Sequence, residues 1–352
     1  MNDEKIFNAL KKITYPGFSR DIVSFGIVSK AILSDSIAIV ELELTTKDDK
    51  ILENLKISIK KTLLEVTEVT GVEIVIKNNF QDQNPDNSGS STVKLDGIKT
   101  IIAIASGKGG VGKSTVAVNL ACALAQTKTS SEKENQVGLM DCDVYGPSVP
   151  QLMGCWERPT VIEENLISPV LNYGVKMISM GLLVDEESPV VWRGPMIMKT
   201  IQQFASNVEW GNLDCLLIDL PPGTGDAQLS IAQVLSLDGV IIVTTPQKTA
   251  FDVAKRGAKM FEKLNIPYLG VIENMSYMEN PITKEKTFPF GNGGGGIIAE
   301  NLKTRLLAEI PLEEEIRQGG DHGIPIVIGA PEHSSSKEFY SLAARISDEI
   351  SS

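Results

Sequence analysis

Cysteine and histidine are scarce in this sequence of 352 residues, which has four cysteines and two histidines. Neither His322 nor His333 has a cysteine or a second histidine at metal-ligand spacing, so we expect both at the surface. The cysteines are too few and too irregularly spaced for a disulfide framework. They are Cys122, Cys142, Cys155 and Cys215.

Long apolar runs and an excess of basic residues are also missing. No apolar run approaches the ~20 residues that a membrane-spanning helix needs. The acidic segment 1–5 is not followed by a signal-peptide core, which favours a cytoplasmic location. A net charge of −12 argues against a broad nucleic-acid surface, because such a surface needs basic residues to displace counterions. We therefore expect neither nucleic acid nor membrane as a partner.

The length is sufficient for about two domains. Segment 1–79 alternates short helical and strand patterns, typical of a small α+β domain. Segment 80–97 is polar, with Pro85 and Gly89, and is expected to be a flexible linker. From 98 to 352, apolar strands alternate with helical stretches, which predicts an α/β domain with a doubly wound, mostly parallel sheet. The expected strands are Thr100–Ala105, Val137–Asp141, Val175–Met180, Leu216–Asp219, Val240–Thr244, Leu269–Glu273 and Leu306–Ile310.

A glycine-rich stretch at 106–115 has the spacing of a phosphate-binding loop. Its glycines allow several backbone N–H groups to converge on phosphate oxygens. Lys113 is expected to reach the β- and γ-phosphates, and the Ser114 hydroxyl to hold Mg²⁺. The helix that follows directs its dipole at the phosphates. The expected nucleotide-binding residues are Gly107, Lys108, Gly109, Gly110, Val111, Gly112, Lys113, Ser114 and Thr115.

Three further polar residues lie at the ends of expected strands, where ligands bind in parallel sheets. Asp143 follows the strand 137–141, where a carboxylate can orient the attacking water. Asp219 ends an apolar strand, which places its carboxylate near the water shell of Mg²⁺. Asn274 ends a later strand, at the same edge of the expected sheet. The segment 221–223 after Asp219 is expected to be a loop that moves with the γ-phosphate.

Two other segments are expected to be structural. The glycine run 291–296 has no Gly-Lys-Ser ending, so we predict a flexible surface loop and not a second phosphate site. The helix predicted at 337–350 has an apolar face that includes Phe339, Leu342 and Ile346. It has only two basic residues, so it is expected to pack on the domain and not on a membrane.

The loop Gly107–Thr115 resembles the deviant phosphate loop of the dimeric ATPases of the MinD/ParA/Mrp group, because Lys108 directly follows Gly107. The resemblance implies a homodimer in which Lys108 reaches the partner's nucleotide. It also implies that Asp143 is the switch carboxylate required for ATP hydrolysis and that Asn274 contacts adenine.

Several motifs together resemble the Mrp/ApbC family of iron–sulfur cluster carrier ATPases over about residues 98–350. They are the segments 143–148, 192–195, 219–226 and 274–277. The N-terminal segment 21–28 is similar to a small domain that precedes the ATPase in many bacterial members. The resemblance implies slow ATP hydrolysis with Mg²⁺ and partners among iron–sulfur assembly or apo-acceptor proteins.

One departure from this family concerns the cluster itself. The family has a Cys-x-x-Cys after the Asn-Met-Ser motif, where two subunits hold a bridging [4Fe–4S] cluster. In this sequence the segment 277–287 contains no cysteine. Cys122 and Cys215 are expected in the core, whereas Cys142 and Cys155 are expected nearer the surface. The cluster is therefore implied by the resemblance alone, because clusters need thiolate ligands.

Three alternatives remain open. A cluster-free regulatory ATPase of the same family would keep the nucleotide site and the partners. A positioning ATPase similar to MinD or ParA would need a basic surface or terminal helix, which this acidic chain does not offer. A small-molecule kinase would need an arginine-rich lid, and the sequence has no such cluster. The carrier ATPase is the interpretation that we favour.

Overall fold

The computed structural model describes residues 4–13, 22–23, 28–34, 36–43, 49–66, 69–77, 95–128, 133–163, 166–182, 194–223, 226–247 and 260–351. The chain divides into two compact units, Met1–Gly89 and Ser90–Ser352, which are described separately. Most of the predicted linker, 80–94, lies outside the described residues, as do residues 192–193 and 224–225 of two of the family-like motifs.

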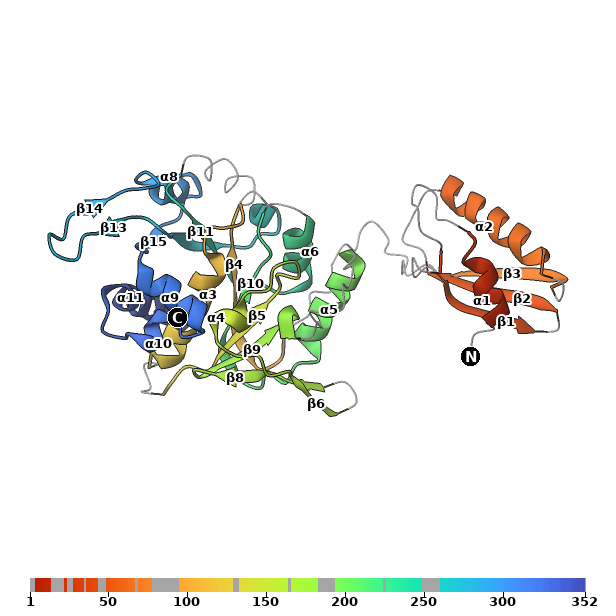
Figure 1. The fold of residues 1–352 in the computed structure, drawn as a ribbon, viewed down its shortest axis with the longest axis horizontal. Helices are drawn as coiled ribbons and strands as arrows, with labels where there is room; N and C mark the ends of the chain where they lie inside the picture. The colour runs from red at the N-terminus through yellow and green to blue at the C-terminus, as the bar shows by residue number, and fades with distance from the viewer. Residues whose placement is uncertain are drawn as a thin grey trace. The chain divides into compact units, whose positions relative to one another are not determined.

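The N-terminal unit is a three-stranded sheet with two helices (Figure 1). The central strand β2 pairs antiparallel with β1 and parallel with β3. Leu55, Ile59 and Leu63 are fully buried and follow helical spacing, so the apolar face of this helix forms part of the core of the unit. The strand β1 was not predicted, because Lys30 and the serines at its ends interrupt its apolar pattern. The elements are α1 (Glu4–Leu10), β1 (Val28–Ser34), β2 (Ile37–Glu43), α2 (Asp49–Leu64) and β3 (Gly71–Lys77).

The C-terminal unit is built on an eight-stranded sheet in the order β15-β12-β11-β4-β10-β5-β9-β8. All neighbouring strands are parallel except β8, which pairs antiparallel with β9. The predicted doubly wound, mostly parallel sheet is thus confirmed. The strands are β4 (Ile98–Ala105), β5 (Val137–Asp141), β8 (Val170–Asn172), β9 (Val175–Ser179), β10 (Leu213–Asp219), β11 (Gly239–Thr244), β12 (Tyr268–Glu273) and β15 (Leu306–Glu309).

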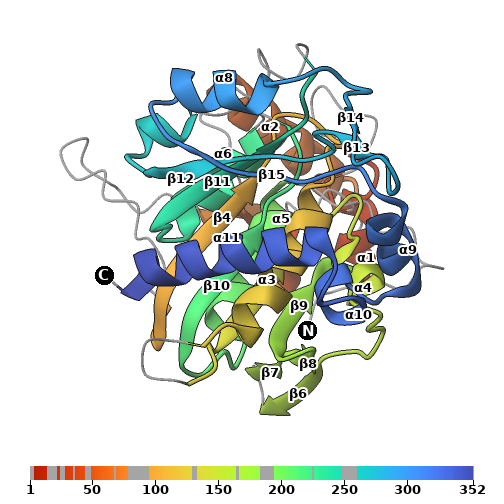
Figure 2. The ribbon, with the colours of Figure 1, turned by 90° about the vertical axis from the view of Figure 1, so that its left-hand side faces the viewer.

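Helices cover both faces of this sheet, and the side chains of each strand alternate between them. Ile102 and Ile104 pack into the core under α3, α10 and α11. Ile101 and Ala103 pack into the core under α5, α6 and α8. Figure 2 shows α11 across the near face with α3 beside it. These helices are α3 (Lys113–Gln126), α5 (Gly194–Ser206), α6 (Asp226–Val234), α8 (Gly294–Asn301), α10 (Ile326–Gly329) and α11 (Ser334–Ser351).

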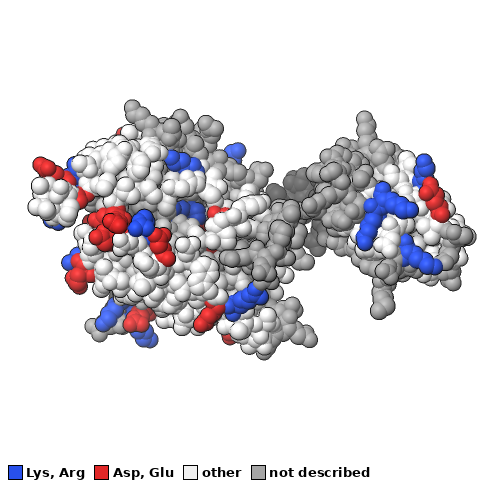
Figure 3. Space-filling model, in the orientation of Figure 1, with Lys and Arg blue, Asp and Glu red and all other residues white. Residues whose placement is uncertain are grey.

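The last helix packs on the domain, as predicted. Phe339, Leu342 and Ala343 of α11 are fully buried in the same core cluster as the apolar residues of α3. None of the helices in the described part of the chain has both the length and the apolar content that a membrane crossing requires. On the face drawn in Figure 3, acidic and basic side chains of the described residues are scattered among uncharged atoms.

The prediction of a flexible loop at 291–296 was wrong for 294–296, because α8 begins at Gly294. The carboxylate of Glu273 accepts a hydrogen bond from the backbone N–H of Gly295 and holds the start of this helix. A Cβ on Gly294 would come 2.5 Å from the carbonyl oxygen of Pro246, and one on Gly295 would come 2.7 Å from Cβ of Glu273. These two glycines are thus needed for close packing and not for flexibility.

Shorter elements surround the carboxyl edge of the sheet and its ends. Two small hairpins, β6–β7 and β13–β14, are antiparallel. The segments are α4 (Val149–Leu152), β6 (Thr160–Glu163), β7 (Leu166–Ser168), η1 (Met180–Leu182), β13 (Met278–Glu279), β14 (Lys286–Thr287) and α9 (Glu314–His322).

Candidate functional site

The glycine-rich loop connects the end of β4 to the start of α3, as its spacing predicts. Gly110 and Gly112 have φ angles of 78° and 77°, in the left-handed region that favours glycine. Gly112 is the N-cap of α3, whose first-turn N–H groups point out of the helix toward the loop. The side-chain amide of Asn274 donates to the carbonyl oxygen of Val111 at 2.8 Å and so fixes the loop to the end of β12.

Three residues predicted to hold phosphate and Mg²⁺ lie together. The ammonium group of Lys113 pairs with Oδ1 of Asp219, and both side chains are almost fully buried. The hydroxyl of Ser114 donates to Oδ2 of Asp219 at 2.6 Å. Lys113 Nζ also lies 3.3 Å from the Ser114 hydroxyl oxygen. Asp219, at the end of β10, thus contacts Lys113 and Ser114, the first two residues of α3.

A second carboxylate lies beside Asp219. Asp141 and Asp219 are register partners on the parallel strands β5 and β10, and both are fully buried. Burial, and then the charge of Asp219, raise the pKa of Asp141 to about 7, although a hydrogen bond from Ser179 opposes the rise. Burial also raises the pKa of Asp219, and the Lys113 ammonium opposes this rise. One buried cation therefore faces two carboxyl groups.

Asp143 lies at the edge of this group and is only half-buried. Its Oδ1 accepts hydrogen bonds from the backbone N–H groups of Tyr145 and Gly146, both at 3.2 Å. Its own backbone N–H donates to Asp141 at 3.0 Å. These bonds hold the turn after β5, and the second carboxylate oxygen, Oδ2, has no protein donor among the hydrogen bonds found for the described residues.

The loop, Asp143 and the segment after β10 enclose a cavity of about 240 Å³. The ammonium group of Lys108 reaches it and donates to the side-chain carbonyl oxygen of Gln247 at 2.8 Å. The cavity is lined by Ser106, Lys108, Gly109, Gly110, Val111, Gly112, Lys113, Ser114, Thr115, Asp143, Gly146, Ser148 and Pro222. All the predicted phosphate-loop residues except Gly107 therefore line one cavity together with Asp143.

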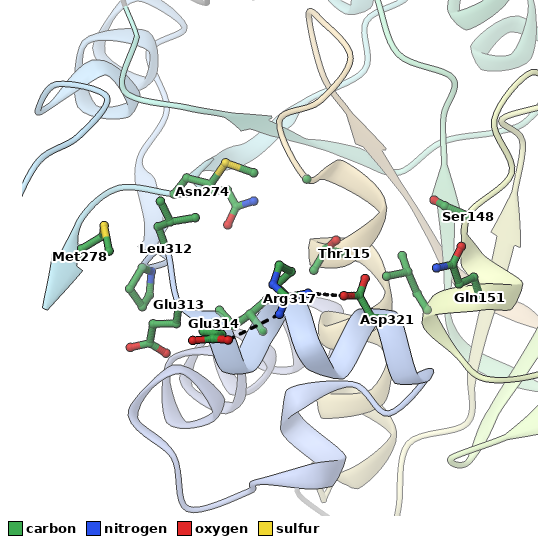
Figure 4. Close-up of a pocket in the computed structure, with 16 residues that line it drawn as sticks. Thr115, Ser148, Gln151, Asn274, Met278, Leu312, Glu313, Glu314, Arg317 and Asp321 are labelled. Atoms are coloured by element: carbon green, nitrogen blue, oxygen red, sulfur yellow. Dashed lines mark hydrogen bonds and ion pairs between the residues drawn. The ribbon is translucent and has the colours of Figure 1, made fainter. Parts of the chain in front are cut away.

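A larger cavity of about 540 Å³ adjoins the first one and shares Gly112, Thr115 and Ser148 with it (Figure 4). Asn274 lines this second cavity, and its exposed fraction is 6 %. On the α9 side, Arg317 forms ion pairs with Glu314 and Asp321 (Figure 4). The larger cavity has a mainly apolar lining and a polar rim, which suits a planar base with its sugar.

The cysteines are buried, so the expectation of surface positions for Cys142 and Cys155 was wrong. Their exposed fractions are 1 % and 7 %, and they belong to core clusters on opposite faces of the sheet. Cys122 and Cys215 are core residues, as predicted. Burial raises the pKa of Cys122 to about 12, so this thiol stays protonated.

The hairpin β13–β14 stands where the resembled family places its cysteine pair. The ring of Tyr277 lies under the ammonium group of Lys286, 3.6 Å from the ring centroid. Near the tip, Ile282 has an exposed fraction of 89 %. The hairpin therefore presents apolar and charged side chains, and no thiolate ligand.

The family model described as "ParA: NUBPL iron-transfer P-loop NTPase" matches residues 97–347. The chain belongs to this family. The iron-transfer P-loop NTPases thus include a chain whose hairpin after β12 has no cysteine.

Curated relatives extend the match beyond the NTPase unit. An "iron-sulfur cluster carrier protein" of Helicobacter pylori is 41% identical over 349 residues, which cover 99% of this chain and 92% of the relative. The "iron-sulfur protein required for NADH dehydrogenase, mitochondrial" of Arabidopsis thaliana is 49% identical and covers 73% of this chain and 80% of the relative. The full-length match means that the N-terminal unit is also shared with named carriers.

Solved structures resemble the NTPase unit. A nucleotide-binding protein of Archaeoglobus fulgidus in complex with ADP is 36% identical, with a TM-score of 0.59, and the match covers 70% of this chain and 93% of that one. The cell division ATPase MinD of Pyrococcus furiosus has a TM-score of 0.54 at 24% identity, over 71% of this chain and 99% of that one. The second likeness shows the shared fold alone.

The sequence analysis missed the residues of the larger cavity that come from the turn between β15 and α9. Leu312, Glu313 and Glu314 line it, followed by Arg317. The signal was present, because this turn follows a predicted strand at the same edge of the sheet as Asp141 and Asp219. The turn has no recognisable binding motif, however, so the sequence alone does not set it apart from other strand ends.

Proposed function

We propose that this protein hydrolyses ATP slowly and uses the nucleotide state to control cluster or partner transfer in iron–sulfur protein assembly. The observation that supports this most strongly is the cluster of Lys113, Ser114 and Asp219 at the base of a glycine-lined cavity. The names of the curated relatives supply the iron–sulfur connection.

Each residue then has a role. The loop N–H groups and Lys113 bind the β- and γ-phosphates, while Asn274 and the larger cavity take the adenosine. Ser114 and Asp219 would hold Mg²⁺, which would supply positive charge next to the phosphates. Ser114 and Asp219 fit this ion, because both offer hard oxygen atoms that lie 2.6 Å apart. Asp143 orients the attacking water with its Oδ2.

Replacing Asp143 tests the hydrolytic role. We expect Asp143→Ala to lose at least 10²-fold in phosphate release while ATP binding stays within a few-fold of the parent. Asp96→Ala is the control, because Asp96 is exposed and lies before the opposite end of β4. If Asp143→Ala released phosphate at the parent rate, the assignment of the water-orienting residue would be wrong.

We also propose that the active form is a homodimer in which Lys108 contacts the partner's nucleotide, as the deviant loop implies. Lys108 lines the cavity and has a single neutral partner, Gln247, among the described residues. Lys108→Ala should then lower ATP hydrolysis and ATP-dependent dimer formation, measured by light scattering, while ATP binding is kept. Equal dimer formation by parent and variant would contradict this role.

The cysteines of this chain are not placed to bind an iron–sulfur cluster. The hairpin after β12 has none, and all four thiols are buried in two separate cores. This observation favours a second candidate function, a cluster-free ATPase of the carrier family that acts on partners holding the cluster themselves.

Anaerobic reconstitution with iron and sulfide separates the two candidates. A colourless protein that still hydrolyses ATP would support the cluster-free form. Stable visible absorption with about four irons per dimer would support a carrier whose thiols become exposed. In that case Cys142→Ser and Cys155→Ser would identify the ligands.

We propose three segments for the chain: an α+β domain over 1–79, a flexible linker over 80–97 and the ATPase over 98–352. Limited proteolysis tests these boundaries, since cleavage should concentrate within 80–97. Cleavage mainly inside either flanking segment would contradict this division.

A further inference from the structure

A group of potential metal ligands lies outside the phosphate-loop cavity. Glu313, Glu315 and His333 each offer a ligand atom, and these atoms all lie within 4.8 Å of one another. Glu313 and Glu315 come from the start of α9, whereas His333 comes from the turn before α11. Two segments that are separate in sequence thus bring two carboxylates and an imidazole to one place.

The distances within this group suit a small divalent ion. Nδ1 of His333 lies 3.4 Å from Oε2 of Glu313. Two ligands of a tetrahedral ion with bonds of about 2.0–2.1 Å are separated by roughly 3.3 Å. The side chains of Glu313 and His333 have exposed fractions of 17 % and 30 %, whereas Glu315 is exposed, so an ion could reach the group from the solvent on the Glu315 side.

A buried residue orients one of the three ligands and contacts a second. Ser335 is fully buried, and its hydroxyl donates to Oε2 of Glu313. Its backbone N–H points at Nδ1 of His333 at 3.3 Å, a long contact that an ion can replace. Hydrogen bonds of this kind to ligating carboxylates orient metal ligands in proteins. Glu313 keeps its second oxygen and further lone pairs for an ion.

We propose that Glu313, Glu315 and His333 form a binding site for a divalent transition-metal ion of the zinc type. An imidazole suits such ions better than it suits Mg²⁺ or Ca²⁺, which prefer oxygen ligands alone. Three protein ligands leave a fourth position for water. Because Glu313 also lines the larger cavity, the ion would tie the rim of that cavity to the start of α11. The sequence spacing around His333 did not predict this site, because the other two ligands are glutamates from a different segment of the chain.

Zinc binding to the full-length protein, freed of metal and nucleotide, tests the proposal independently of ATP hydrolysis. Equilibrium dialysis should find one Zn²⁺ per chain at micromolar free zinc. Glu315→Gln and His333→Ala should each weaken binding at least tenfold. Glu332→Gln is the matched control, since Glu332 is the preceding residue and its side chain is 91% exposed. No bound zinc, or parent-like binding by both variants, would overturn the site.

Two further measurements distinguish this site from the cysteines and from misfolding. Co²⁺ bound here should give visible d–d bands without a thiolate charge-transfer band in the near ultraviolet, and such a band would contradict the proposal. Zinc should raise the melting temperature of the parent but not of Glu315→Gln, because an ion stabilises only a fold that binds it. An equal rise in both proteins would also contradict it.

Discussion

Gly112 lies where any larger residue would clash with its neighbours. A Cβ there would come 2.2 Å from Nδ2 of Asn274, in addition to the strain of a φ of 77°. We expect Gly112→Ala to displace Asn274 from Val111 and to lower ATP affinity at least tenfold, measured by calorimetry. Gly110→Ala is the comparison, because its φ is 78° but nothing lies within 4 Å of a Cβ there. Equal losses in the two variants would show that the contact with Asn274 is unimportant.

The buried carboxyl of Asp141 should make stability depend on pH. Its pKa of about 7 in the folded protein exceeds its ordinary value, so the folded state keeps a proton that the unfolded chain releases. The free energy of unfolding should therefore fall as pH rises from about 4 to about 7, by up to ~1.4 kcal/mol per pH unit from this group. Urea unfolding without nucleotide measures this slope. Asp141→Asn should make the slope shallower and Asp96→Asn should not, whereas equal slopes in parent and Asp141→Asn would contradict the account.

The end of β12 connects the phosphate loop to the hairpin and to α8. Glu273 is fully buried, and it accepts hydrogen bonds from the Ser276 hydroxyl at 2.6 Å and from the Gly295 N–H. The next residue, Asn274, holds Val111 of the loop. Glu273, the last residue of β12, thus holds the segment 276–301, and Asn274, directly after the strand, holds the phosphate loop.

Replacing this carboxylate tests the connection. In Glu273→Gln the amide oxygen can still accept from the Gly295 N–H, but the NH₂ group then faces Ser276, whose hydroxyl must turn from donor to acceptor. Losing the bond to a charged acceptor costs about 1.5–3 kcal/mol. Hydrogen–deuterium exchange should become faster in 276–301 and change less in 106–115. Glu279→Gln, on the half-exposed hairpin, is the control. Unchanged exchange in 276–301 of Glu273→Gln would show that this carboxylate does not hold the segment.

Strands were predicted correctly from the sequence where an apolar run is also buried in the structure. The seven predicted strands all lie in the large sheet, because each is a largely apolar run and most of its residues are buried. The edge strand β8 has three residues, which is too short for a periodic signal. The start of α8 at Gly294 was missed, because glycine runs predict loops unless close packing against Pro246 and Glu273 is known.

Part of the candidate site could also be predicted from local sequence patterns. Lys113, Ser114 and Asp219 belong to local motifs, and the rule that ligands bind at strand ends correctly predicted that they meet. The partners of His333 and the cavity-lining turn after β15 depend on how α9 and α11 pack together, which no local pattern encodes. The burial of Cys142 likewise follows from the sheet face on which it lies.

At the scale of the whole molecule, a NUBPL-type NTPase unit follows a small α+β unit, and named carriers share both. The NTPase unit has the phosphate loop and the strand-end carboxylates, whereas the hairpin after β12 has no cysteine. Because iron–sulfur clusters need thiolate ligands, this chain has the nucleotide site without cluster ligands in that hairpin.

Phosphate release from Mg²⁺–ATP by the parent and by Lys113→Ala tests the central claim most directly. We expect slow, Mg²⁺-dependent release by the parent and none above background by the variant, with the fold checked by circular dichroism. Because Lys113→Ala leaves the buried Asp219 without its cation, Ser114→Ala serves as a milder second variant that should also lose Mg²⁺-dependent release. If folded Lys113→Ala released phosphate at the parent rate, the phosphate loop would not be the site of hydrolysis.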